Sequence, residues 1–169
     1  MRNQYAGAQG NFQRSGSYPG IPADTALTSV SPIVIDGEKD VVIQNVQVSN
    51  SNGPCIQING AQNILIENSE IGPCSGHGIF ASWSYGIDIR NSYIHDTGGV
   101  NIQTHEVGGL NVYNNWLERG TSLVHNSTSY QVMVTHNKFL NAKGPYPGGA
   151  FVQFDSVAGK GNRINCNVG

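Results

Sequence analysis

The chain has 169 residues, of which only 12% are charged, and its formal net charge at pH 7 is −2. A chain of this length fits about one domain. With so few basic residues it has no surface that would neutralise a phosphate backbone, so nucleic acid is not an expected partner. No apolar run is long enough to cross a membrane, and the N-terminal residues do not resemble a secretion signal.

The N-terminal segment, residues 1–31, differs from the rest of the chain. It lacks an apolar period, and glycine and proline interrupt it repeatedly. These residues are Gly7, Gly10, Gly16, Pro19, Gly20 and Pro22. Residues 1–31 are therefore predicted to form an irregular segment or cap, and residues 32–169 the main domain.

A short apolar motif recurs through the main domain. Its last residue is Asn45, Asn68, Asn91 or Asn114, at a spacing of 23 residues, and a fifth copy ends in His136 after 22 residues. A second strand-like run, such as Ile56-Gln57-Ile58, lies about ten residues upstream of each copy, and a third follows it. A fixed period in the twenties together with alternating apolar residues predicts an all-β fold, a parallel β-solenoid of about five to six rungs. Leucine-rich repeats share this period but need more leucines than the chain contains.

The recurring asparagine is predicted to be structural. Asparagine tolerates the left-handed backbone of a tight turn, and stacked side-chain amides can hydrogen-bond from rung to rung as an asparagine ladder. His136 is expected to take the same turn position. Residues of opposite charge also recur one rung apart, so Glu67 is predicted to pair with Arg90 and Asp96 with Arg119.

Polar residues on the first strand of each rung form the leading candidate site. Residues that alternate with the inward aliphatic side chains should point outward and stack on their counterparts one rung away. One column is Val34, Gln57, Phe80, Gln103, His125 and Gln153, and its neighbour is Asp36, Asn59, Ser82, His105, Ser127 and Asp155. Histidine can act as general acid or base near neutral pH, so His105, His125 and Asp155 are the catalytic candidates. The alternative is a solvated polar strand face without catalytic function.

Aromatic residues suggest a sugar-binding surface. A third outward column is expected to run Gln47, Glu70, Tyr93, Trp116 and Lys138. Flat aromatic rings suit the apolar faces of sugars, and amides can bond the hydroxyl groups. The predicted glycan-binding residues are Phe80, Trp83, Tyr93, Gln103, Trp116 and Gln153. For Trp116 the alternative is a cation–π contact with Lys138.

The three cysteines, Cys55, Cys74 and Cys166, have no metal-ligand spacing. Cys55 and Cys74 fall on adjacent rungs and are compatible with either a disulfide or two buried thiols. The lightly charged, Asn- and Ser-rich composition and the Asn126-Ser127-Thr128 triplet favour an extracellular or cell-surface location.

The chain stops at Gly169, inside the motif that would complete a sixth rung. A terminal rung must hide its apolar interior and its unpaired strand edges. The expected explanations are truncation at the C-terminus, continuation on another chain, or end-to-end, homo-oligomeric association.

The segment from Ile33 to Val168 resembles the right-handed parallel β-helix of the pectate-lyase-like superfamily. The resemblance implies a right-handed solenoid and a carbohydrate-directed function, either a polysaccharide lyase or a glycoside hydrolase acting on an extracellular polysaccharide. The alternative is a non-catalytic structural, adhesive or tailspike-like module that binds glycans or self-associates.

Two local motifs depart from the families that they resemble. Gly76-His77-Gly78 is similar to a polygalacturonase motif, but the accompanying aspartates are missing, so His77 is expected to be a turn residue. Tyr85-Gly86-Ile87-Asp88 resembles the start of an alginate-epimerase motif and then continues with Ile89. No cofactor is expected, and calcium only at the margins because the carboxylates are scattered.

Overall fold

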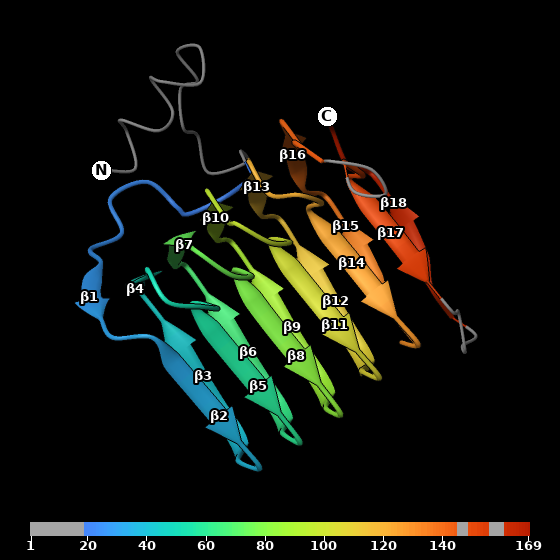
Figure 1. The fold of residues 1–169 in the computed structure, drawn as a ribbon, viewed down its shortest axis with the longest axis horizontal. Coiled ribbons are helices and arrows are strands. Elements are labelled where there is room, and N and C mark those ends of the chain that lie inside the picture. The colour runs from blue at the N-terminus through green and yellow to red at the C-terminus, as the bar shows by residue number, and fades with distance from the viewer. Residues whose placement is uncertain (1–18, 145–148, 156–160) are drawn as a thin grey trace.

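The computed structural model of the protein describes residues 19–144, 149–155 and 161–169. Within these ranges it contains eighteen strands and no helix (Figure 1). The strands form three sheets of six, and each strand pairs in parallel with the strand three places further along the chain.

Three strands make up each rung, one from each sheet. Sheet A contains β1 (Thr28–Val30), β4 (Val46–Asn50), β7 (Glu70–Cys74), β10 (Tyr93–His95), β13 (Trp116–Glu118) and β16 (Lys138–Leu140). Sheet B contains β2 (Ile33–Asp36), β5 (Ile56–Asn59), β8 (Ile79–Ser82), β11 (Ile102–His105), β14 (Val124–Ser127) and β17 (Val152–Asp155). Sheet C contains β3 (Lys39–Gln44), β6 (Gln62–Glu67), β9 (Tyr85–Arg90), β12 (Gly108–Tyr113), β15 (Met133–Thr135) and β18 (Arg163–Asn165).

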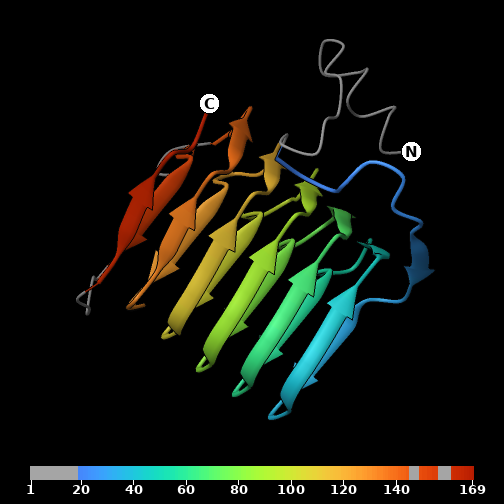
Figure 2. The same ribbon diagram turned by 180° about the vertical axis from the view of Figure 1, so that it is seen from behind.

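The predicted solenoid is confirmed by the register of these strands. In sheet B, Ile33 pairs with Ile56, Ile56 with Ile79, and Ile79 with Ile102, so equivalent residues are 23 positions apart. The next partners, Val124 and Val152, follow after 22 and 28 residues. Seen from either side, the rungs stack along one axis as the chain passes from sheet B to C to A (Figures 1 and 2).

The core is a column of aliphatic side chains between the three sheets. Each rung contributes inward residues from all three strands, as Ile79, Ile87 and Ile94 do in one rung. These side chains are fully buried because alternate residues of a strand face opposite sides. The same alternation exposes the intervening residues, and this is why the register decides which side chains can bind a ligand.

The turn between sheets C and A has the expected left-handed backbone. Asn45, Asn68, Asn91 and Asn114 have φ between 51° and 56°, and His136, with φ 58°, takes the same position. The side-chain amide of Asn114 donates to that of Asn91 at 2.8 Å. Amide stacking along the whole column stays a prediction.

A continuous hydrogen-bond ladder occupies the next position along the chain. The side-chain oxygen at this position accepts the backbone N–H of the equivalent residue one rung earlier, at 2.8–3.3 Å. The ladder residues are Ser69, Ser92, Asn115, Asn137 and Asn167. They satisfy buried backbone donors where the chain turns, and unpaired donors there would be destabilising.

The N-terminal segment covers the outer face of sheet A. Its strand β1 pairs with β4, so the predicted irregular segment includes a strand, and residues 1–18 lie outside the described part. Ile21 is fully buried against Tyr93 and Trp116, and the Gly20 N–H donates to the Asn114 carbonyl at 2.9 Å. Tyr93 and Trp116 are therefore 1% and 0% exposed. The two rings do lie on the outer side of sheet A, but the prediction that they are exposed to a glycan is wrong.

Charged residues on and beside sheet A bond to one another. The Arg119 guanidinium binds both carboxylate oxygens of Asp96 at 2.8 Å, and Asp96 contacts His95 Nδ1 at 2.7 Å. Tyr93 donates to the buried Glu118 carboxylate, and burial raises the pKa of Tyr93 well above its ordinary value. The predicted Asp96–Arg119 pair is thus present. On sheet C, Arg90 Nε lies 2.9 Å from Glu67 Oε2, as predicted.

Candidate functional site

The outward face of sheet B carries the two predicted polar columns. Val34, Gln57, Phe80, Gln103, His125 and Gln153 are register partners in successive strands. The second column also consists of register partners, namely Asp36, Asn59, Ser82, His105, Ser127 and Asp155. Side-chain hydrogen bonds already join the first three of the second column, since Asn59 donates to Asp36 at 2.9 Å and Ser82 donates to Asn59 at 3.1 Å. The face is therefore an ordered polar strip that runs across the rungs.

His125 and Asp155 form a bonded pair at one end of this strip. His125 Nε2 lies 2.7 Å from Asp155 Oδ2, and the Gln153 amide donates to both carboxylate oxygens at 3.2 and 3.3 Å. Donation from Gln153, and then from His125, lowers the pKa of Asp155. Asp155 therefore stays ionised and fixes the orientation of the imidazole. Three predicted site residues are brought together here, and Gln103, the register partner of His125, lies beside them.

His105 has different partners from His125. Its Nε2 lies 3.6 Å from Glu106 Oε1, and its ring meets Trp83 edge to face with centroids 5.6 Å apart. Its register partner on the next rung is Ser127, and that of Ser127 is Asp155. The predicted patch thus consists of two imidazole–carboxylate pairs on one face, and Phe80 contributes a half-buried ring that packs against His77 at 5.4 Å.

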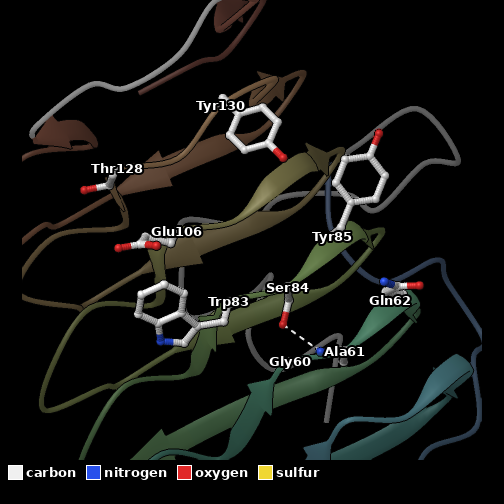
Figure 3. A pocket seen from close by; sticks show the side chains of 9 residues that line it. All are labelled: Gly60, Ala61, Gln62, Trp83, Ser84, Tyr85, Glu106, Thr128 and Tyr130. Carbon is white, nitrogen blue, oxygen red and sulfur yellow. Dashed lines mark hydrogen bonds between the residues drawn. The ribbon is translucent and has the colours of Figure 1, made fainter.

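A groove of about 520 Å³ adjoins His105, where the chain turns from sheet B to sheet C (Figure 3). Trp83, Glu106 and Thr128 lie along one side, and Gln62, Tyr85 and Tyr130 along the other. Gly60, Ala61 and Ser84 complete the lining, and the Ala61 N–H donates to Ser84 Oγ at 3.0 Å. The exposed fractions are 60% for Trp83, 52% for Tyr85 and 41% for Tyr130, so three aromatic rings border a polar groove.

The first side of the groove has an unusual backbone. Trp83, Glu106 and Thr128 have φ of 53°, 52° and 52°, in the left-handed region. Earlier rungs place Gly37 and Gly60 in the same turn position, with φ 82° and 61°. Glycine adopts this conformation without a Cβ clash, whereas bulky and β-branched residues adopt it at a cost. Side chains kept in such positions point to a function.

The second side of the groove was not part of the predicted site, although Tyr85 and Tyr130 were expected to project from the surface. Gln62, Tyr85 and Gly108 are successive register partners, and Gly108 bridges to Tyr130. A Cβ on Gly108 would lie 2.4 Å from the Tyr130 ring, so glycine makes room for that ring. The spacing of Gln62, Tyr85 and Gly108 could have indicated this column from the sequence. Tyr130 follows after 22 residues and lies outside a named strand, so alternation alone did not select it.

His77 takes a turn role. Its Nδ1 accepts the Val100 N–H at 3.0 Å, and burial lowers its pKa. The open question about the cysteines is settled, because Cys55 and Cys74 form a disulfide, while Cys166 is free and exposed. Asn126 of the glycosylation triplet is buried and accepts a hydrogen bond from Thr104 Oγ1, so its amide does not face solvent in the folded chain.

The described part of the chain has neither a membrane-spanning helix nor a cluster of metal ligands. None of its residues forms a helix long and apolar enough to cross a membrane. No three His, Cys, Asp or Glu side chains in the described ranges gather as metal ligands would. Calcium binding at the margins of the surface stays a prediction.

Comparison with known proteins agrees with this architecture. No curated protein matches the chain. A family model described as a right handed beta helix region matches residues 31–169, which contain strands β2 to β18. The match supplies the hand of the coil, and the wider pectate-lyase-like assignment is consistent with it. The chain therefore belongs to the right-handed β-helix family.

Proposed function

We propose that the protein binds a polysaccharide chain in the groove beside His105 and along the outward face of sheet B. The observation that carries the proposal is the set of exposed aromatic rings of Trp83, Tyr85 and Tyr130 around a groove that also presents Glu106. Aromatic rings cover the apolar faces of sugars, and carboxylate and amide oxygens accept hydrogen bonds from hydroxyl groups. An extended strip beside the groove suits a polymer better than a small compact ligand.

The disulfide supports an extracellular site of action. A disulfide is stable in oxidising compartments, and Cys55 and Cys74 are both buried and bonded. We therefore place the protein outside the cell or on its surface, where polysaccharides are accessible. Association of copies through rung edges is a further proposal, tested by measuring the molar mass in solution.

Tryptophan fluorescence tests the binding directly. The chain has two tryptophans, and only Trp83 is exposed, since Trp116 is buried. We expect oligosaccharide titration to change the emission of Trp83 and to reduce its quenching by acrylamide. Trp83→Ala should weaken binding at least about tenfold, measured by calorimetry. Tyr113→Ala is the matched control, because Tyr113 is also an exposed aromatic residue but does not line the groove. Equal binding by both variants would refute the groove as the site.

Cleavage of the bound chain is the second candidate function. The specific observation in its favour is the His125–Asp155 pair, in which an ionised carboxylate orients an imidazole at the surface. Such a histidine can donate a proton to a leaving oxygen or take one from water. New reducing ends that depend on His125 and form without an unsaturated product would establish hydrolysis, and an unsaturated product would establish a lyase. Binding without either product would identify a non-catalytic module.

A further inference from the structure

The binding surface has an uneven distribution of charge. Asp36 and Asp155 lie at opposite ends of the same outward column of sheet B, and Glu106 lines the groove beside it. The residues between the two aspartates, Asn59, Ser82, His105 and Ser127, carry amide, hydroxyl or imidazole groups. A chain bound along this column would meet carboxylates at both ends and in the groove.

The described lysines and arginines lie elsewhere on the solenoid. They are Lys39, Arg90, Arg119, Lys138, Lys143 and Arg163. Arg90 is paired with Glu67 on sheet C, and Arg119 with Asp96 beside sheet A. Lys138 lies over the buried Trp116 ring at 4.8 Å, on sheet A. Lys39 pairs with Gln62 from the preceding rung and is not among the residues that line the groove. Among the described residues, none of the strands of sheet B carries a lysine or arginine.

We propose that the site selects a neutral polysaccharide and disfavours a polyuronate. This inference rests on the proposed function and specifies its ligand class. A polyuronate carries one carboxylate per sugar, so recognition would require cationic partners along the strip, and Asp36, Glu106 and Asp155 would repel it. A neutral chain offers only hydroxyl and apolar groups, which the amides, hydroxyls and aromatic rings of this surface match without a charge partner.

The ligand class also narrows the chemistry of any cleavage. Elimination requires a carboxylate next to the carbon that loses its proton, and a neutral sugar lacks that group. If the site cleaves its ligand, hydrolysis is therefore the reaction that its preferred chain can undergo. Water then supplies a hydroxyl group to one new chain end and a proton to the other.

The test compares matched oligosaccharides on the intact protein by calorimetry and Trp83 fluorescence. The neutral probes are oligomers of glucose, xylose and galactose, and the acidic probes are oligogalacturonate and oligomannuronate of the same length. We expect at least one neutral probe to bind about tenfold or more tightly than either acidic one at low salt. Raising the salt should narrow this ratio, because screening weakens repulsion between exposed charges. Titrations with added calcium and with chelator show whether a cation can substitute for missing basic residues.

A charge variant sharpens the comparison. Glu106→Gln keeps the shape of the groove and removes one carboxylate, so it should raise the affinity for oligogalacturonate relative to that for the best neutral probe. Asp88→Asn removes the same charge from sheet C and should leave the ratio unchanged. Acidic probes that bind as tightly as neutral ones would overturn the neutral-ligand inference and leave the proposed function standing. If no probe of either class binds, both fail.

Discussion

Trp83, Glu106 and Thr128 have a left-handed backbone in a turn position where the two earlier rungs carry glycine. Their backbone N–H groups donate to the next rung at 3.0 Å, to His105, Ser127 and Asp155 respectively, so the stack holds the turn in this conformation. Strain of this kind persists where the surrounding structure enforces it. The neighbouring rung thus holds the first side of the groove in a conformation that costs a β-branched or bulky residue more than glycine.

Replacing Thr128 with glycine should therefore stabilise the fold. A β-branched residue in the left-handed region costs about 1–2 kcal/mol, and the greater freedom of glycine in the unfolded chain offsets part of the gain. We expect Thr128→Gly to raise the free energy of unfolding by about 1 kcal/mol in urea titrations.

The control for this variant is Thr121→Gly. Thr121 lies in a loop without positive φ, so glycine there should lower stability by about 0.5–1 kcal/mol. If Thr128→Gly is destabilising to the same extent, the turn is not strained and the argument from backbone conformation fails.

For the strands and turns, the sequence predicted most of the pairings and turn conformations that the repeat period determines. Alignment of the recurring strand-like runs, together with strict alternation, predicted the pairing of His105 with Ser127 and of Ser127 with Asp155, although these pairs lie 22 and 28 residues apart. They also predicted the turn conformation of Asn45 through His136. The continuous ladder lies one residue further on, since the side-chain oxygens of Ser69 and Asn115 accept backbone N–H groups of the preceding rung.

The prediction failed where a residue's surroundings come from outside the repeat. Tyr93 and Trp116 do lie on the outer side of sheet A, but the aperiodic segment around Ile21 covers them. No periodic signal indicates where such a segment packs. Tyr130 was expected to project from the surface but was not placed in the candidate site for a related reason, because the rung is one residue shorter there and the ring lies over Gly108.

The pairing of Asp96 with His95 and Arg119 leads to a prediction about acid stability. The hydrogen bond with His95 is the largest cause and the bond with Arg119 the second, and together they hold the pKa of Asp96 well below its ordinary value. A carboxyl group whose folded pKa is lowered stabilises the fold above its unfolded pKa of about 3.9 and loses that contribution as the pH falls toward the folded pKa. Asp96→Asn should therefore be less stable than the wild type at pH 7, and its stability should change less below about pH 4.

Urea titrations at pH 7, 4 and 3 check this prediction. Asp88→Asn on the outer face of sheet C removes the same formal charge without breaking the Arg119 contacts, so it should follow the wild-type profile. An equal loss of stability in acid for Asp96→Asn and the wild type would show that Asp96 does not couple folding to protonation.

The whole molecule presents three outer faces with different character. Sheet A is covered by the N-terminal segment, which buries Trp116, whereas sheet B exposes its polar columns and the adjoining groove. Sheet C is exposed as well, and Val42, Met133 and Tyr113 on it are accessible. A ligand therefore has two open faces to choose between, and only one of them combines aromatic rings with a groove and two imidazole–carboxylate pairs.

Hydroxyl-radical footprinting distinguishes these faces in a single experiment. With a bound oligosaccharide, oxidation of Trp83, Tyr85 and Tyr130 should fall severalfold, because their exposed rings line the groove. Met133 and Tyr113 are similarly exposed on sheet C and should be oxidised at an unchanged rate. Trp116 should stay protected with or without ligand, since the cover of sheet A does not depend on binding. Protection of Met133 and Tyr113 in place of the groove residues would move the binding surface to sheet C, and the polar columns of sheet B would then be a solvated face.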